Sequence, residues 1–324
     1  MLGPIDRLVT ASFPRWGIAP EATATMINHS ENVTYRIDDP STGKPTILRV
    51  HRPGYHSEAA IRSELQWLNA LREEAGVPTA PPIPGRDGEL IQLLESDELP
   101  EPRYAVLFTH LPGREPPEDA LLGPFERLGQ VTAKLHRHVQ HWPLPHGFTR
   151  HTWDFDTMLG GQPIWGDWRE GIGMDGAHQA VLQRLADRIE ARLSRYGKGP
   201  ERFGLVHADL RLANLLIDDE TTRVIDFDDC GFSWYMYDLG TALSFIEDRP
   251  DVPDLVDAWV RGYRRSAPLS AEDEAEIPTF ILLRRLLLVA WIGSHAETEL
   301  AQSMGAAYTE GSCTLAEHYL SRFG

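Results

Sequence analysis

A polar segment flanked by short apolar runs constrains this chain more than any other feature. The runs at residues 215–217 and 223–227 enclose a polar stretch, which is typical of a β-hairpin with a five-residue loop. Centring that loop on Glu220 sets Asn214 opposite Asp226. The sequence therefore predicts a hairpin that brings an amide oxygen and a carboxylate together.

These two oxygen ligands suit Mg²⁺, which proteins bind through one or two carboxylates together with the phosphates of a substrate. Asp209 lies five residues before Asn214, in the loop that leads into the same hairpin. A carboxylate there can accept a proton from a hydroxyl group that is directed at the phosphate. We therefore predict Asn214 and Asp226 as metal ligands and Asp209 as a general base.

The chain around this hairpin changes character near residue 110. Before that point, hydrophobic periodicity predicts a hairpin, one helix and two further short strands, over residues 33–51, 57–75, 90–94 and 104–109. Ser57 is the expected N-cap of the helix. Beyond residue 113 the same periodicity predicts three helices, over residues 124–138, 177–196 and 279–296. We therefore expect two lobes, 1–110 and 111–324.

Composition limits the classes of function. The 324 residues carry a formal net charge of −17, which argues against general affinity for nucleic acid or anionic membranes. Cys230 and Cys313 are too few for a disulfide framework and fit a reducing compartment. The most apolar stretch, 280–292, is interrupted by Arg284 and Arg285 and is too short to span a bilayer. We expect a soluble cytoplasmic protein, a monomer or a homodimer, without nucleic-acid or membrane partners or a signal peptide.

The run His207-Ala208-Asp209, with Asn214 after it and Ile-Asp-Phe-Asp following a hairpin, resembles the aminoglycoside phosphotransferase and choline kinase superfamily, relatives of the protein kinases. Tyr-Asp-Leu at residues 237–239 extends the resemblance. It implies an α+β, two-lobed, protein-kinase-like fold with a small antiparallel-sheet N-lobe and a larger helical C-lobe. Relatives mostly have Gly at the position of Ala208.

The resemblance implies an ATP- and Mg²⁺-dependent kinase that phosphorylates a hydroxyl group of a small molecule. Nucleotide would sit between the N-terminal nucleotide-binding lobe and the C-terminal catalytic and acceptor-binding lobe. Asp209 would take the hydroxyl proton, and His207 would hold the backbone of its loop. Arg211 lies where protein kinases carry a Lys that meets the transferring phosphate, so its guanidinium would bind charge on the γ-phosphoryl oxygens.

Arg49 takes the strand position at which kinases place the Lys that holds the α- and β-phosphates. Glu64 borders the buried face of the predicted helix, where a carboxylate needs a partner. We predict a bidentate pair between Arg49 and Glu64 that still offers donors to phosphate. A solvated position on the flank of the helix is the alternative for Glu64.

Further contacts are assigned by position. A glycine-free loop stands where kinases carry a Gly-rich loop and supplies Ser30 and Asn32, although a plain polar turn fits equally well. Phe108 and His110 belong to the expected adenine-facing segment. The expected acceptor-side wall is acidic and aromatic and comprises Asp228, Asp229, Trp234, Tyr235 and Trp291. Such a wall favours an amine-bearing acceptor.

Two alternative functions stay open. The passage at residues 153–168 resembles the branch that holds stress-response and homoserine-type kinases, which is compatible with a Ser/Thr protein kinase. The missing Lys and the missing loop glycines are features of a pseudokinase binding module, against which the intact Asp209, Asn214 and Asp226 argue. The histidine-rich stretch 136–151 also invites a zinc site, but no cysteine or acidic ligand lies near it at metal-site spacing.

Overall fold

The computed structural model describes residues 3–29, 32–117, 120–218 and 221–324 and divides into two compact units. The smaller unit comprises Met1–Gly113 and the separate segment Leu144–Arg150. The larger unit comprises Arg114–Pro143 and His151–Gly324. The sequence suggested one boundary near residue 110, whereas the chain passes from one unit to the other three times.

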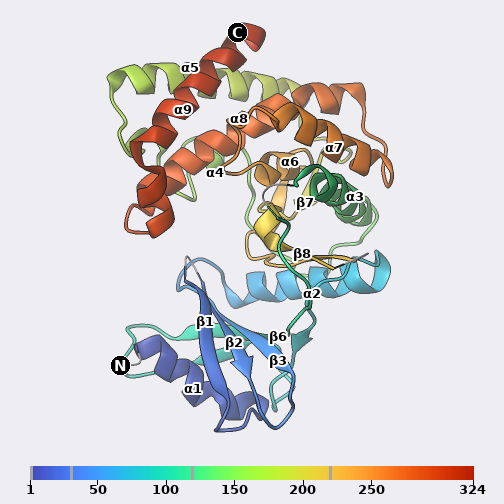
Figure 1. The fold of residues 1–324 in the computed structure, drawn as a ribbon, viewed down its shortest axis with the longest axis vertical. Coiled ribbons are helices and arrows are strands. Elements are labelled where there is room, and N and C mark those ends of the chain that lie inside the picture. Colours follow the sequence, from blue (N-terminus) through green and yellow to red (C-terminus); the bar gives the residue numbers. More distant parts are fainter. Residues whose placement is uncertain (1–2, 30–31, 118–119, 219–220) are drawn as a thin grey trace. The chain divides into compact units, whose positions relative to one another are not determined.

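The smaller unit is built on an antiparallel sheet with the strand order β1-β2-β3-β6-β4, and β5 also pairs with β6 (Figure 1). The strands are β1 (Thr23–His29), β2 (Val33–Asp38), β3 (Pro45–Val50), β4 (Pro82–Ile83), β5 (Gln92–Leu94) and β6 (Arg103–Thr109). The hairpin predicted over 33–51 is thus the pair β2 and β3. The two further strands predicted from alternation are also confirmed.

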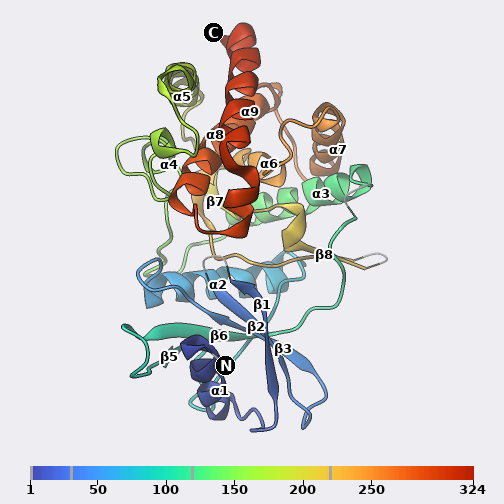
Figure 2. The ribbon, with the colours of Figure 1, turned by 60° about the vertical axis from the view of Figure 1, so that its left-hand side comes forward.

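Helices α1 (Pro4–Trp16) and α2 (Glu58–Glu74) cover the two faces of this sheet (Figures 1 and 2). Residues of α1 pack into the core cluster that contains Leu48 and Val50. Successive strand residues point to opposite faces, so the intervening Arg49 projects to the side from which α2 supplies its polar partner. The predicted helix over 57–75 is confirmed, and its N-cap serine accepts the expected backbone hydrogen bond.

The larger unit is mainly helical. Its α-helices are α3 (Leu122–Val139), α4 (Phe155–Met158), α5 (Gly176–Tyr196), α6 (Tyr237–Ala242), α7 (Val252–Arg264), α8 (Ala271–Ser294) and α9 (Glu299–Phe323). Short 3₁₀ helices and two-stranded sheets complete it: η1 (Trp168–Glu170), η2 (Leu212–Asn214), β7 (Phe203–Val206) with β10 (Gly231–Trp234), and β8 (Leu215–Ile217) with β9 (Thr222–Val224). Helices α3, α5 and α8 confirm the three predicted helices.

Helix α8 lies inside the helical unit and packs against α5, α6 and α9 (Figure 2). It begins earlier than predicted because Ser270 and Asp273 form a capping box ahead of the apolar stretch. By length and composition it could cross a membrane, yet 78% of its most apolar window is buried within the protein. Burial of this kind is that of a core helix in a soluble protein.

Helices α3 and α7 approach each other through reciprocal glycines. A Cβ built at Gly129 of α3 would lie 2.0 Å from the carbonyl oxygen of Trp259, and one built at Gly262 of α7 would lie 1.8 Å from the carbonyl oxygen of Glu126. No larger residue fits at either position without separating the backbones. The two glycines therefore set the spacing of this helix pair.

The register predicted for the β8–β9 hairpin is wrong by one residue. A five-residue loop pairs Ile217 with Arg223, but in the structure Leu216 faces Arg223. The reason lies in the turn, where Asp218 and Thr221 exchange both backbone hydrogen bonds at 3.1 Å and so close a shorter loop. Glu220, on which the prediction was centred, lies outside the described residues.

The shorter loop also changes which residue faces Asn214, the predicted metal ligand. The amide nitrogen of Ile225 donates to the carbonyl oxygen of Asn214 at 3.0 Å, so Asp226 is one residue beyond that pair. Asp226 has a φ of 59° and leaves the strand in a left-handed conformation. Its carboxylate therefore comes from a bend after β9 rather than from the ladder itself.

Candidate active site

The loop after β7 is held by Asp238 of α6. Its carboxylate accepts hydrogen bonds from the backbone nitrogens of His207 at 3.2 Å and Ala208 at 2.8 Å. On its other side, Oδ2 of Asp238 lies 3.0 Å from Nε2 of His136 on α3. All four residues are buried, so Asp238 organises this loop from inside the helical unit.

His207 holds the backbone of the loop, as expected. Its Nε2 lies 3.1 Å from the carbonyl oxygen of Ile225, and the amide nitrogen of Asp209 donates to its Nδ1 at 3.3 Å. The ring also packs against Phe227, with 4.4 Å between the ring centroids. These contacts tie the loop after β7 to the segment that follows β9.

The Asp209 carboxylate is fixed by three donors. Its Oδ1 accepts a hydrogen bond from Nη2 of Arg284 at 2.7 Å. Its Oδ2 accepts one from Nδ2 of Asn214 at 3.0 Å and a longer one from Nε of Arg211 at 3.3 Å. The Asp209 side chain is 15% exposed. A carboxylate that is held in this way and still reaches solvent can meet a hydroxyl group.

Arg284 of α8 is a member of this site that the sequence reasoning missed. Its guanidinium is buried, with 2% of the side chain exposed. Burial by itself lowers the pKa of this guanidinium, but Tyr237 and Asp209 outweigh that effect and raise the pKa above its ordinary value. A signal was present in the sequence, since a charge within an apolar helix must find a partner.

The predicted metal ligands can serve a metal only together with other groups. Nδ2 of Asn214 donates both to the carbonyl oxygen and to Oδ2 of Asp209, which leaves Oδ1 as the oxygen turned away from that carboxylate. Asp226 is exposed. Within the described ranges, no three His, Cys, Asp or Glu side chains form a metal-binding group. These donors fit an ion that is also bound by substrate phosphates.

The histidine-rich stretch has a different role from the zinc site that it invited. His136 is the buried member of this stretch. Its Nδ1 lies 3.1 Å from the hydroxyl oxygen of Tyr263 on α7, and its Nε2 contacts Asp238. Both ring nitrogens are thus used in holding the loop after β7. The described residues of this stretch give no support to a zinc site.

In the smaller unit, Arg49 and Glu64 form the predicted buried ion pair. A single nitrogen, Nη2 of Arg49, donates to Oε1 at 2.6 Å and to Oε2 at 2.7 Å. The side chains are 7% and 1% exposed, so the solvated alternative for Glu64 is wrong. Both oxygens of the Glu64 carboxylate thus contact one nitrogen of the Arg49 guanidinium. The guanidinium carbon lies 5.2 Å from the ring centroid of Phe108.

The other predicted nucleotide contacts of this unit have local partners. Oδ1 of Asn32 accepts a hydrogen bond from the backbone of Arg52 at 3.0 Å. Nε2 of His110 lies 3.5 Å from Nη1 of Arg36. Burial lowers the pKa of His110, and the nearby Arg36 cation lowers it further. Ser30 lies outside the described residues. Among the described members, Arg49 therefore contacts Glu64 and Phe108, whereas Asn32 and His110 have other partners.

The residues expected to line the acceptor side are largely packed in the helical unit. Nε1 of Trp234 donates to the carbonyl oxygen of Gly197 at 2.7 Å. Tyr235 packs against His136, with 4.8 Å between the ring centroids, and burial raises the pKa of its phenol to about 12. Trp291 is 8% exposed. These aromatic residues contribute packing around the loop and α8.

The acidic members of that wall differ in exposure. Asp228 is buried, with 5% of the residue exposed, whereas Asp229 is partly exposed. The carbonyl oxygen of Asp229 accepts a hydrogen bond from Nε1 of Trp153 at 2.8 Å, which fixes the backbone at this point. Of the two carboxylates, Asp229 is the one that a ligand can reach from solvent.

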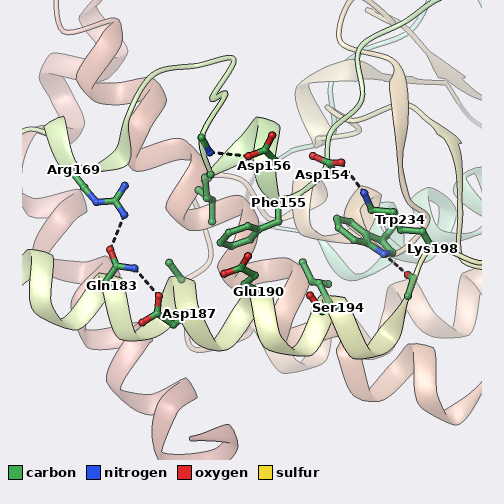
Figure 3. Close-up of a pocket in the computed structure, with 16 residues that line it drawn as sticks. Asp154, Phe155, Asp156, Arg169, Gln183, Asp187, Glu190, Ser194, Lys198 and Trp234 are labelled. Carbon is green, nitrogen blue, oxygen red and sulfur yellow. Dashed lines mark hydrogen bonds and ion pairs between the residues drawn. The ribbon is translucent and has the colours of Figure 1, made fainter.

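Trp234 also lines a pocket of about 720 Å³ beside α4 and α5 (Figure 3). Some of the polar groups that line it contact one another: Lys198 binds Asp154 at 2.7 Å, and Gln183 bridges Arg169 and Asp187. Asp209 is not among the described residues that line it. The pocket is thus distinct from the loop that carries the catalytic candidates.

Comparison with known proteins agrees with this geometry. The family model "Phosphotransferase enzyme family" matches residues 23–275. The solved structure of a microcompartment-associated aminopropanol kinase is 44% identical to this chain, with a TM-score of 0.91 and 98% of each chain covered. Amicoumacin kinase from Bacillus subtilis is 24% identical over 294 residues, which span 87% of this chain and 83% of that protein.

Similarity in fold extends further than similarity in sequence. The structure of a spectinomycin phosphotransferase is 14% identical to this chain, yet the TM-score is 0.65 over 97% of this chain and 98% of that one. The sheet of the smaller unit and the helices of the larger one are therefore those of the protein-kinase-like phosphotransferases. Since the family model also matches most of the sequence, this chain belongs to the phosphotransferase enzyme family and is a kinase-like enzyme, as its motifs indicated.

Proposed function

We propose that this protein is an ATP- and Mg²⁺-dependent kinase that transfers the γ-phosphoryl group to the hydroxyl of a small amino alcohol. The observation that carries the proposal is the Asp209 carboxylate, which is fixed by three donors, one of them from α8, and still reaches solvent. The 44% identity to an aminopropanol kinase over 98% of the chain supports this class of acceptor. The net charge of −17 favours a cationic acceptor.

In the proposed reaction, the acceptor hydroxyl donates its proton to Asp209 as its oxygen attacks the γ-phosphorus. The new oxygen–phosphorus bond forms while the bond to the β-phosphate oxygen breaks, so that ADP leaves. Arg211, beside Asp209, stabilises charge on the transferring phosphoryl oxygens. Asn214 and Asp226 would hold Mg²⁺, which when bound neutralises phosphate charge, and Arg49 would bind the inner phosphates.

The test is a phosphoryl-transfer assay with the purified protein, ATP and Mg²⁺. The acceptor panel contains 1-amino-2-propanol, ethanolamine, choline and homoserine, with propane-1,2-diol as the matched compound that lacks the amine. A generic protein substrate is assayed in parallel. We expect transfer to an amino alcohol and little transfer to the diol. Phosphorylation of protein alone would instead establish the protein-kinase alternative.

Two variants check the assigned roles. Asp209→Asn should keep nucleotide affinity and lower turnover by at least about 100-fold, the scale of losing a general base. Asp226→Ala should remove the dependence of nucleotide binding on the divalent ion, measured by calorimetry with and without Mg²⁺. Nucleotide binding without any turnover in the wild-type protein would favour the pseudokinase alternative.

The same proposal places the enzyme in the cytoplasm. Cys230 and Cys313 are the only cysteines in the sequence, a number that fits a reducing compartment. ATP, the proposed phosphoryl donor, is a cytoplasmic substrate. Fractionation of cells that produce the protein would test this assignment.

A further inference from the structure

We propose that Arg284 is a positioning residue for this reaction: it fixes the Asp209 carboxylate so that Oδ2 is the oxygen that receives the acceptor proton. The inference rests on the proposed function. Nη2 of Arg284 donates a hydrogen bond to Oδ1 of Asp209 at 2.7 Å, and the charges on both groups strengthen this bond. Oδ2 has the weaker set of contacts, with Asn214 at 3.0 Å and Arg211 at 3.3 Å.

Arg284 is suited to this role because its own guanidinium is held on several sides. Nε donates to Oγ of Ser244 at 2.9 Å, and Nη1 donates to the hydroxyl of Tyr237 at 3.2 Å and to the carbonyl oxygen of Ala208 at 3.4 Å. The guanidinium carbon lies 5.1 Å from the ring centroid of Trp165. A side chain that is buried and bonded in this way stays in place when the acceptor binds. It therefore defines one fixed orientation of the Asp209 carboxylate.

The second arginine at Asp209 has the opposite character. Arg211 is 36% exposed, and its contact with Oδ2 is the longest of the three that hold the carboxylate. It can therefore leave Oδ2 when the acceptor hydroxyl arrives and move to the phosphoryl oxygens. Arg284 thus supplies the fixed contact, whereas Arg211 supplies the exchangeable one.

The neighbouring residue offers a matched control. Arg285 is as deeply buried as Arg284, and its Nη1 lies 2.8 Å from Oε2 of Glu247, with side-chain exposures of 3% and 0%. Its Nε donates to Oγ of Ser312 at 2.7 Å, and its guanidinium lies over the ring of Tyr308. Arg285 therefore has an equivalent structural ion pair directed toward α9 and residue 247 instead of the catalytic loop.

The experiment compares Arg284→Lys with Arg285→Lys. Both variants should lower Tm, because each loses the planar guanidinium from a buried pair. Arg284→Lys should also lower kcat by about 10- to 100-fold, the scale of a misplaced catalytic group. Its KM for ATP should stay within about twofold of the wild-type value, since the lost orientation acts in the transition state. Arg285→Lys should leave kcat unchanged.

A double-mutant cycle separates positioning from general damage. In an Asp209→Asn background, Arg284→Lys should cause no further loss of kcat, because the two changes act through one contact. Equal losses of kcat in the two arginine variants, additivity in the cycle, or an unchanged kcat in Arg284→Lys would each overturn the inference.

Two further measurements keep the inference testable if Arg284→Lys folds poorly or if the wild-type protein shows no phosphoryl transfer. Ser244→Ala removes one hydrogen-bond acceptor of Arg284 while keeping its guanidinium, so it should lower kcat severalfold and lower Tm by less than Arg284→Lys does. An unchanged kcat in this variant counts against the inference. Hydrogen exchange of the amides at 205–214 should accelerate in Arg284→Lys but not in Arg285→Lys. If the wild-type protein transfers no phosphoryl group, only the proposed function is contradicted, because hydrogen exchange still reports whether Arg284 holds the loop. Equal hydrogen exchange in the two arginine variants overturns the inference.

Discussion

At the scale of single residues, Ala208 shows a backbone strain that the fold retains in the loop after β7. Its φ is 65°, in the left-handed region, which costs a residue with a Cβ roughly 1–2 kcal/mol. Two hydrogen bonds to the Asp238 carboxylate, from His207 and Ala208 itself, hold the chain in this conformation. The structure thus gives a physical reason why glycine, which lacks a Cβ, would suit this position.

Replacing this residue tests the strain directly. Ala208→Gly should raise the free energy of unfolding by up to about 1 kcal/mol, because relief of the left-handed strain exceeds the entropy that glycine gains in the unfolded chain. Urea unfolding measures the difference. Ala213→Gly, in the adjacent 3₁₀ helix, is the matched control and should lower the free energy of unfolding. A less stable Ala208→Gly variant would show that the loop carries no strain at this position.

The buried pair of Arg49 and Glu64 allows a second prediction at this scale. Glu64→Gln and Arg49→Ala should each lower the free energy of unfolding by about 3–5 kcal/mol, because each leaves a buried group without its partner. Both should also weaken binding of Mg·ATP by about tenfold or more if the arginine holds phosphate, a change worth at least about 1.4 kcal/mol. Thermal unfolding and calorimetry report the two effects separately.

The control for that pair lies on the same helix. Arg62 and Glu58 form an exposed i,i+4 pair, with side chains 45% and 50% exposed. Arg62→Ala should change stability by no more than about 0.5 kcal/mol and should leave nucleotide affinity unchanged. The effects of Arg49→Ala and Glu64→Gln should be strongly non-additive, and additive effects would count against a shared role.

At the scale of secondary-structure elements, the spacing of α3 and α7 bears on the position of the loop after β7. His136 on α3 is held between Tyr263 of α7 and Asp238, which in turn binds the loop. Close approach of the helices depends on Gly129 and Gly262, each of which faces the backbone of the other helix. Separation of the helices would therefore be transmitted to the loop.

Gly129→Ala should destabilise the protein by roughly 1–3 kcal/mol, as expected when a methyl group is forced against backbone atoms. It should also reduce turnover, because the chain of contacts through His136 shifts. Gly123→Ala is the matched control on the same helix, since a Cβ there meets nothing within 4 Å, and it should be neutral or slightly stabilising. Denaturant unfolding and initial rates of the two variants give the comparison; indistinguishable variants would contradict it.

Elements with strong local signals could be predicted from the sequence, and long-range pairings could not. Helix α2 followed from its N-cap and its apolar stripe, and the Glu64 pair followed from the position of a carboxylate beside that stripe. The register of β8 and β9 depends on how Asp218 and Thr221 close the turn, which alternation over three-residue strands does not encode. Arg284 meets Asp209 across 75 positions of sequence, so only its need for a partner was visible.

At the scale of the whole molecule, we expect the burial of phenols to make the protein sensitive to alkaline pH. Seven of the nine tyrosines have a raised pKa, with burial as the first cause in each. The pKa values of Tyr235 and Tyr237 are raised from 10.0 to about 12. A phenol whose pKa is higher in the folded state favours folding fully below its unfolded pKa, and this contribution is lost as pH rises through the folded value.

The free energy of unfolding should therefore fall steeply between about pH 10 and pH 12. Phenolate absorbance should appear together with loss of helical circular dichroism, because these phenols ionise as the chain unfolds. Tyr235→Phe should make the decline with pH shallower. Complete ionisation of the tyrosines in a protein that remains folded is the result that would contradict this prediction.

The three crossings of the chain between its units bear on how the protein is made on the ribosome. The smaller unit needs Leu144–Arg150 for completion, so it cannot finish folding when its first 113 residues have emerged. When Leu144–Arg150 has been synthesised, α3 of the larger unit has been synthesised as well. Its partner helix α7, which packs against it through Gly129 and Gly262, follows only at Val252–Arg264. We therefore expect the nascent chain to carry α3 as an unpaired amphipathic helix during much of its synthesis, which makes this segment a binding site for chaperones that act during translation.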